Sequence, residues 1–155
     1  MAIEWRMRVR ILLGVAVVAG TGCASLKAFQ ARQQYIQDQT RGHTYAKPIA
    51  AVWPEVRKLL FEKGFKTKDS DTGNSFSLET EEKKEGDSKV RYLVLGTKLD
   101  EGSCKVEFTR MGAGVLGPTS ERDLDLEWAL LRRVEPEAGE KIEHEATAAG
   151  ERTKT

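Results

Sequence analysis

The sequence predicts an α+β fold: a three- to four-stranded antiparallel meander with two helices packed on one face, after an N-terminal signal and lipid-anchor segment. Two segments, residues 48–64 and 120–134, repeat apolar residues at helical spacing. Between them, three segments alternate apolar and polar residues with a period of two, as strands with one buried face do. Strands grouped between helices in this way are typical of the α+β class.

The N-terminal segment, residues 1–22, has the composition of an export signal. Arg6, Arg8 and Arg10 precede a short apolar run over residues 11–22. This run would span about 18 Å as a helix at about 1.5 Å per residue, whereas a bilayer core of about 30 Å needs about 20 residues. We therefore expect a cleaved signal peptide rather than a permanent membrane span.

Cys23 follows this signal directly. Residues 20–23, Gly-Thr-Gly-Cys, resemble the lipobox of bacterial lipoproteins, with a glycine at the position where leucine is usual. The resemblance implies that Cys23 is lipidated and becomes the mature N-terminus. The alternative is an unmodified cysteine near an uncleaved anchor.

The mature chain is expected to have three parts. Residues 23–44 are rich in glutamine and predict a lipidated polar stalk with partial helicity. Residues 45–136 contain the apolar patterns and predict the α+β domain. Residues 137–155 predict an acidic tail that is partly helical and then disordered from Gly150 onward.

The first helix of the domain is expected within residues 48–64, with Gly64 as its stop. Pro54 fits only in the first turn of a helix, so the regular helix should begin near Val52 or Trp53.

The second helix is expected over residues 120–134, with Ser120 as its N-cap. The strands are expected over residues 75–80, 90–95 and 104–109, with turn residues between them. The side chains on their buried faces would be Phe76, Leu78, Thr80, Val90, Tyr92, Val94, Cys104, Val106 and Phe108.

Charge argues against nucleic-acid binding, and cysteine content argues against an intramolecular disulfide. Removal of residues 1–22 leaves 22 basic and 23 acidic side chains, interspersed along the chain, so no broad basic field exists to bind nucleic acid. With Cys23 lipidated, Cys104 has no partner for an intramolecular disulfide. Its place in an alternating strand predicts a small buried side chain, and a reactive thiol is the alternative.

Three patterns resemble functional motifs, and none has the context that its chemistry requires. Residues 112–117 match G-x-G-x-x-G, but Pro118 interrupts and no parallel strand follows, so a loop between strand and helix is expected. Residues 69–74 lack the ligand order of a calcium loop. The acidic residues of 79–87 alternate with lysines, which predicts a solvated hairpin.

The two histidines, His43 and His144, have no nucleophile or second metal ligand at a suitable spacing. We therefore predict no catalytic, metal-ligating or cofactor-binding residue, and no enzyme.

Leu93 and Leu95 lie on the strand face that is otherwise polar. Either the 111–118 loop or the stalk covers them, or they form an exposed apolar patch of the kind that binds partners. Val115 and Leu116, in the glycine-rich loop, could contact the same partner. These four residues are the candidate partner-binding site.

Residues 52–65 open with Val-Trp-Pro-Glu-Val and end with Lys-Gly-Phe, and are followed by Glu79-Thr80-Glu81 and Arg91-Tyr92. Over residues 48–134 this arrangement resembles one domain of the BamC-like (NlpB) lipoproteins of the outer-membrane β-barrel assembly machine. The resemblance implies a helix-grip α+β domain with a periplasm-facing, non-catalytic accessory role.

We therefore expect a lipid-anchored envelope protein that binds another envelope protein, and the resemblance suggests outer-membrane protein assembly as the process. Ala24 stands where an aspartate would resemble an inner-membrane retention signal, so the outer membrane is the expected location. One alternative is a carrier of a small apolar ligand or lipid in a cavity between helix and sheet. Another is an enzyme that acts on envelope substrates.

Overall fold

The computed structural model describes residues 24–68, 76–114 and 117–153. The chain divides into two compact units. The larger unit is Gln37–Lys141, and the smaller contains the segments before and after it. Two helices cross the boundary between the units: an N-terminal helix over residues 24–42, and α4 (Pro136–Arg152).

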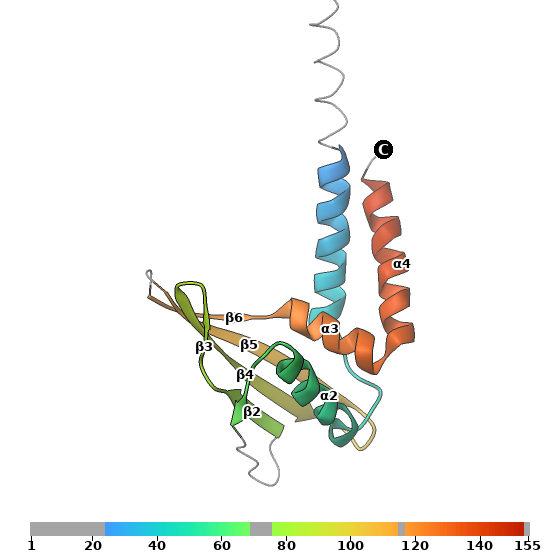
Figure 1. Ribbon diagram of the computed structural model, residues 1–155. Helices are drawn as coiled ribbons and strands as arrows, with labels where there is room; N and C mark the ends of the chain where they lie inside the picture. Colours follow the sequence, from blue (N-terminus) through green and yellow to red (C-terminus); the bar gives the residue numbers. More distant parts are fainter. Residues whose placement is uncertain (1–23, 69–75, 115–116, 154–155) are drawn as a thin grey trace, which may run out of the picture. The chain divides into compact units, whose positions relative to one another are not determined.

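The larger unit contains a fully antiparallel sheet of six strands within the described residues (Figure 1). Its order is β1-β2-β4-β5-β6, and β3 pairs with β4. The strands are β1 (Thr67–Lys68), β2 (Phe76–Thr80), β3 (Lys83–Glu85), β4 (Ser88–Lys98), β5 (Cys104–Gly114) and β6 (Gly117–Arg122). β4 and β5 form the long central pair, in register from Lys89 opposite Ala113 to Lys98 opposite Cys104.

The α+β class and the antiparallel sheet are confirmed. The three predicted strands appear as β2, β4 and β5, but β4 and β5 extend beyond their predicted ends and three more strands join the sheet. β1 and β3 have two and three residues, too few to show a periodic pattern. The prediction of three to four strands was therefore too low.

α2 (Ile49–Glu62) starts earlier than predicted, so Pro54 lies inside the helix rather than in its first turn. Proline has no N–H to donate to the carbonyl four residues earlier, which is that of Ala50. Ala50 and Pro54 are both exposed, so water can bond this carbonyl. As predicted, the helix stops before Gly64, whose φ of +79° suits glycine.

α3 (Leu124–Val134) starts later than predicted. Residues 117–122 form β6 and pair with β5, so Ser120 lies in a strand and is not the N-cap. Asp123 takes that role, with Oδ1 2.9 Å from the backbone N of Leu126. The described residues of the predicted loop, 112–114 and 117, therefore belong to β5 and β6, and α3 begins only after β6.

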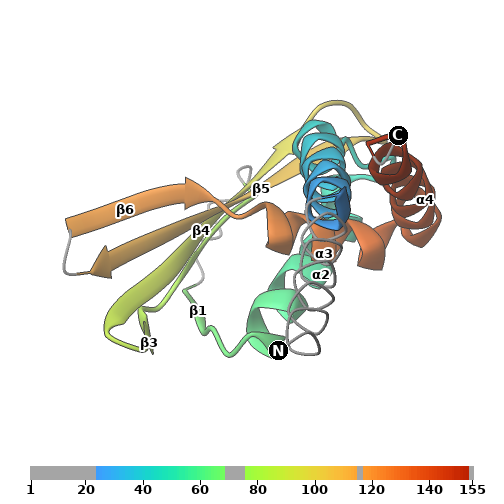
Figure 2. The same cartoon turned by 90° about the horizontal axis from the view of Figure 1, so that it is seen from above.

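α2 and α3 pack on one face of the sheet (Figures 1 and 2). The core of the larger unit lies between this face and the two helices. The packing is close at Gly96 of β4. A Cβ there would lie 2.8 Å from Ile49 Cδ1 and 3.0 Å from Trp53 Cζ3. The buried side chains of this core include Val52, Val56, Leu60, Leu78, Val90, Tyr92, Val94, Cys104, Val106, Phe108, Leu126, Leu130 and Leu131.

The described part of the smaller unit consists of two helical segments that lie side by side, residues 24–36 and 142–153 (Figures 1 and 2). The Tyr35 hydroxyl donates to Glu145 Oε2 at 2.6 Å. Gly150 lets the two helical segments approach each other closely, because a Cβ at this position would lie 2.8 Å from the carbonyl oxygen of Ala28. The chain remains helical to Arg152, so the prediction of disorder from Gly150 was wrong for residues 150–152.

Candidate functional site

Leu93 and Leu95 lie on the face of β4 that points away from α2 and α3. Their neighbours on β4, Tyr92 and Val94, are buried in the core, whereas Leu93 is half-buried and Leu95 is 44% exposed. We call this side of the central strands the outer sheet face. It consists of Ser77, Glu79, Arg91, Leu93, Leu95, Lys105, Glu107, Thr109 and Met111.

Strand register decides which side chains surround the two leucines. Leu95 lies between Ser77 of β2 and Glu107 of β5, and Leu93 lies between Glu79 and Thr109. Residues 111–114 belong to β5 and pair beside β4, so the expectation that a loop over 111–118 covers the leucines was wrong for this part. The outer sheet face is therefore a mixed surface, with two leucines set among polar and charged groups.

The charged groups beside the leucines are paired within the protein. Arg91 Nη1 bonds Glu79 Oε1 across β4 and β2. Arg122 Nη1 lies 3.2 Å from Glu107 Oε1. These pairs are partly exposed, and exposed ion pairs contribute about 0–1 kcal/mol each, so a binding partner could rearrange them at low cost.

The other predicted site residues fall largely outside the described residues. Cys23, Val115 and Leu116 lie there, as do residues 69–74. The flanking glycines of the G-x-G-x-x-G pattern are described, and Gly114 pairs with Gly117 and Gly112 with Thr119. The described residues of the pattern thus belong to the paired strands β5 and β6. A dinucleotide site would instead need a helix that starts inside it.

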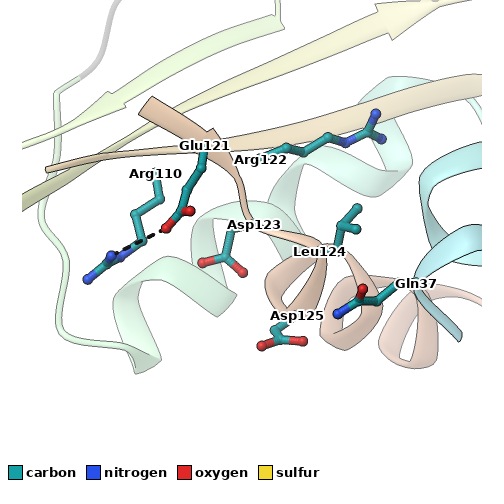
Figure 3. Close-up of a pocket in the computed structure, with 7 residues that line it drawn as sticks. All are labelled: Gln37, Arg110, Glu121, Arg122, Asp123, Leu124 and Asp125. Atoms are coloured by element: carbon teal, nitrogen blue, oxygen red, sulfur yellow. Dashed lines mark ion pairs between the residues drawn. The ribbon is translucent and has the colours of Figure 1, made fainter. Parts of the chain in front are cut away.

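A charged cleft of about 410 Å³ lies at the start of α3 (Figure 3). Figure 3 shows Arg110 and Glu121 directed at each other, and their Nη1 and Oε1 atoms are 3.7 Å apart. Asp123 uses both carboxylate oxygens: Oδ1 caps α3, and Oδ2 accepts from the Tyr92 hydroxyl at 2.8 Å. The lining residues are Gln37, Arg110, Glu121, Arg122, Asp123, Leu124 and Asp125.

The hydrogen bonds around this cleft stabilise the fold rather than prepare a reactive group. Burial, and then the hydrogen bond to Asp123, raise the pKa of Tyr92, so its hydroxyl stays protonated. Hydrogen bonding to Glu127 raises the pKa of Arg122. The sequence pattern did not reveal this cleft, because it depends on how β5 and β6 align. The register of Arg110 opposite Glu121 was the missing signal.

Cys104 is fully buried, as its place in the alternating strand predicted. Burial raises the pKa of its thiol to about 11, which leaves little thiolate at neutral pH. His43 Nε2 lies 2.8 Å from Glu135 Oε2. Within residues 24–68, 76–114 and 117–153, no three His, Cys, Asp or Glu side chains gather where they could hold a metal ion.

Comparison with protein-family models, curated proteins and solved structures finds no match to this chain. Among the helices of the described residues, none has both the length and the apolar character needed to cross a bilayer.

Proposed function

We propose that this protein is a lipid-anchored envelope protein that faces the periplasm and acts as a non-catalytic interaction module. The observation that carries the proposal is the N-terminal sequence: three arginines, a short apolar run and small residues end at Cys23. Acylation of Cys23 with two or three chains would attach the protein stably, whereas a single chain gives marginal binding. Ala24 favours the outer membrane as its location.

The outer sheet face is the proposed partner-binding surface. Leu95 is exposed among charged groups, and an interface with a small apolar centre and a polar rim has this composition. The predicted partner is another envelope protein, and the resemblance to the BamC-like lipoproteins suggests a role in outer-membrane protein assembly. Val115 and Leu116 are proposed to extend the same surface.

The anchor is tested by replacing Cys23. Cells that express the wild-type protein or Cys23→Ala are labelled with radioactive palmitate and then fractionated. We expect label and membrane fractionation for the wild-type protein, and neither for the variant. A wild-type chain that carries no palmitate would contradict the proposal.

The partner surface is tested by crosslinking in cells. A photoreactive amino acid at position 95 should capture one dominant envelope protein. The matched control is position 61, which is also occupied by a large exposed apolar residue but lies on α2. Equal capture at both positions would argue against the outer sheet face.

The alternative function, a carrier of an apolar ligand, would need a cavity between helix and sheet. Val52, Val56, Leu60, Val94 and Phe108 in this layer have no exposed surface, and Gly96 leaves no room for a Cβ. We therefore prefer the interaction module.

A further inference from the structure

Two large apolar side chains near the start of the N-terminal helix are exposed. Leu26 and Phe29 each expose 57% of their surface. They are three residues apart, so they lie on one side of the helix. The side toward residues 142–153 is different, since it includes Ala28 and Tyr35.

The exposed apolar surface of this helix is confined to its beginning. Beyond Phe29, the next large aliphatic residue, Ile36, is buried, and the exposed positions include Gln30 and Gln33. The segment 24–36 also contains two basic residues, Lys27 and Arg32, and no acidic residue. Helices that bind anionic lipid surfaces combine exposed apolar residues with basic side chains in this way.

Distance along the helix places this pair near the anchor. The helix is described from Ala24, which directly follows Cys23 in the sequence. At about 1.5 Å per residue, Leu26 lies about 3 Å and Phe29 about 8 Å from Ala24 along the axis. The headgroup region is about 5–8 Å thick on each side of a bilayer. Both residues therefore fall within about one headgroup layer of the lipid-bearing residue.

We propose that the first turns of this helix bind the membrane surface, with Leu26 and Phe29 inserted among the lipid headgroups and Lys27 beside lipid phosphates. This inference rests on the proposed lipidation of Cys23. The acyl chains provide the attachment, and the helix contact holds the start of the N-terminal helix against the bilayer. Gln33, one turn after Phe29, lies in water.

The test measures how deeply single positions enter the bilayer. Full-length lipidated Phe29→Cys and Gln33→Cys proteins carry a nitroxide and are reconstituted in vesicles of phosphatidylethanolamine and phosphatidylglycerol. Cys104 is buried and should remain unlabelled, and the sulfur of Cys23 is occupied by lipid. Intact mass spectrometry verifies one lipid modification and one label per chain. Electron paramagnetic resonance then compares access of oxygen with access of a water-soluble nickel chelate.

The oxygen-to-nickel access ratio should be higher at position 29 than at position 33, and addition of vesicles should leave position 33 unchanged. Equal ratios in a lipidated chain would overturn the helix contact and leave the anchor intact. Reduced access of both reagents at position 29 would show a protein contact instead and would also overturn it. A chain without lipid on Cys23 would remove both proposals.

Discussion

Arg122 and Glu127 form a bidentate ion pair, in which Nε and Nη2 of the arginine each lie 2.8 Å from one carboxylate oxygen. Glu127 is only 3% exposed, and its Oε1 also accepts from the backbone N–H of Phe108 at 3.1 Å. One buried carboxylate thus connects α3 to both β5 and β6.

Arg122→Met should destabilise the protein by roughly 3 kcal/mol, because removal of one partner leaves a buried charge uncompensated. Urea unfolding followed by circular dichroism measures the loss. The control Arg91→Met removes the partly exposed pair with Glu79 and should cost no more than about 1 kcal/mol. A second change, Glu127→Gln, should restore part of the stability of Arg122→Met because it removes the buried charge. Equal losses in the two arginine variants would contradict this account.

Gly96→Ala should destabilise the larger unit by about 1–3 kcal/mol, the usual cost of overpacking. The new methyl would lie within 3.0 Å of Ile49, Phe76 and Trp53, so α2 would have to move away from β4. Tryptophan fluorescence, to which both Trp53 and Trp128 contribute, follows urea unfolding.

Gly102→Ala is the matched control for that substitution. A Cβ there has only Asp100 Oδ1 nearby, at 3.8 Å, and the change should cost within about 0.5 kcal/mol. A Gly96→Ala protein as stable as this control would show that the contact between α2 and the sheet is looser than described.

Sequence periodicity revealed the strands that bury one face and missed those that do not. β2, β4 and β5 alternate because every second side chain packs beneath α2 or α3. β6, with the sequence Gly-Pro-Thr-Ser-Glu-Arg, is an edge strand with mostly exposed residues, so it has no apolar period. β6 is positioned by its pairing with β5. The register of this pairing cannot be read from any periodicity within β6 itself.

The same limit applies to the surfaces. The pattern correctly set Leu93 and Leu95 on the face opposite the core, because side-chain direction alternates along a strand. The cleft at Arg110 and Asp123 could not be derived, since it requires the register of β5 with β6 and the end of that strand at Arg122.

The thiol of Cys104 should make stability depend on pH in the alkaline range. Burial raises its pKa from 9.0 to about 11 in the folded protein. Folding therefore favours the protonated thiol, and this contribution is complete below pH 9 and is lost as pH rises through 11. Between pH 8 and pH 11 the wild-type protein should therefore lose stability relative to Cys104→Ala, by an amount on the order of 2 kcal/mol in unfolding free energy.

Urea unfolding of both proteins between pH 8 and pH 11 measures this difference. The comparison cancels the ionisation of tyrosines, which both proteins share. Alkylation with iodoacetamide at pH 8 gives an independent check: native Cys104 should not react, whereas a cysteine at the exposed position 61 should. A constant stability difference, or rapid alkylation of Cys104, would contradict a buried thiol.

Asp123→Ala should destabilise the protein by roughly 2–3 kcal/mol, because it removes the N-cap of α3 and leaves the Tyr92 hydroxyl without its acceptor. Ser120→Ala, at the N-cap that the sequence predicted, should change stability by less than about 0.5 kcal/mol because Ser120 is exposed in β6. Adding Tyr92→Phe to Asp123→Ala should recover the part of the loss that comes from the unpaired hydroxyl. Urea unfolding of the four proteins separates the two contributions, and a larger loss for Ser120→Ala than for Asp123→Ala would return the start of α3 to its predicted place.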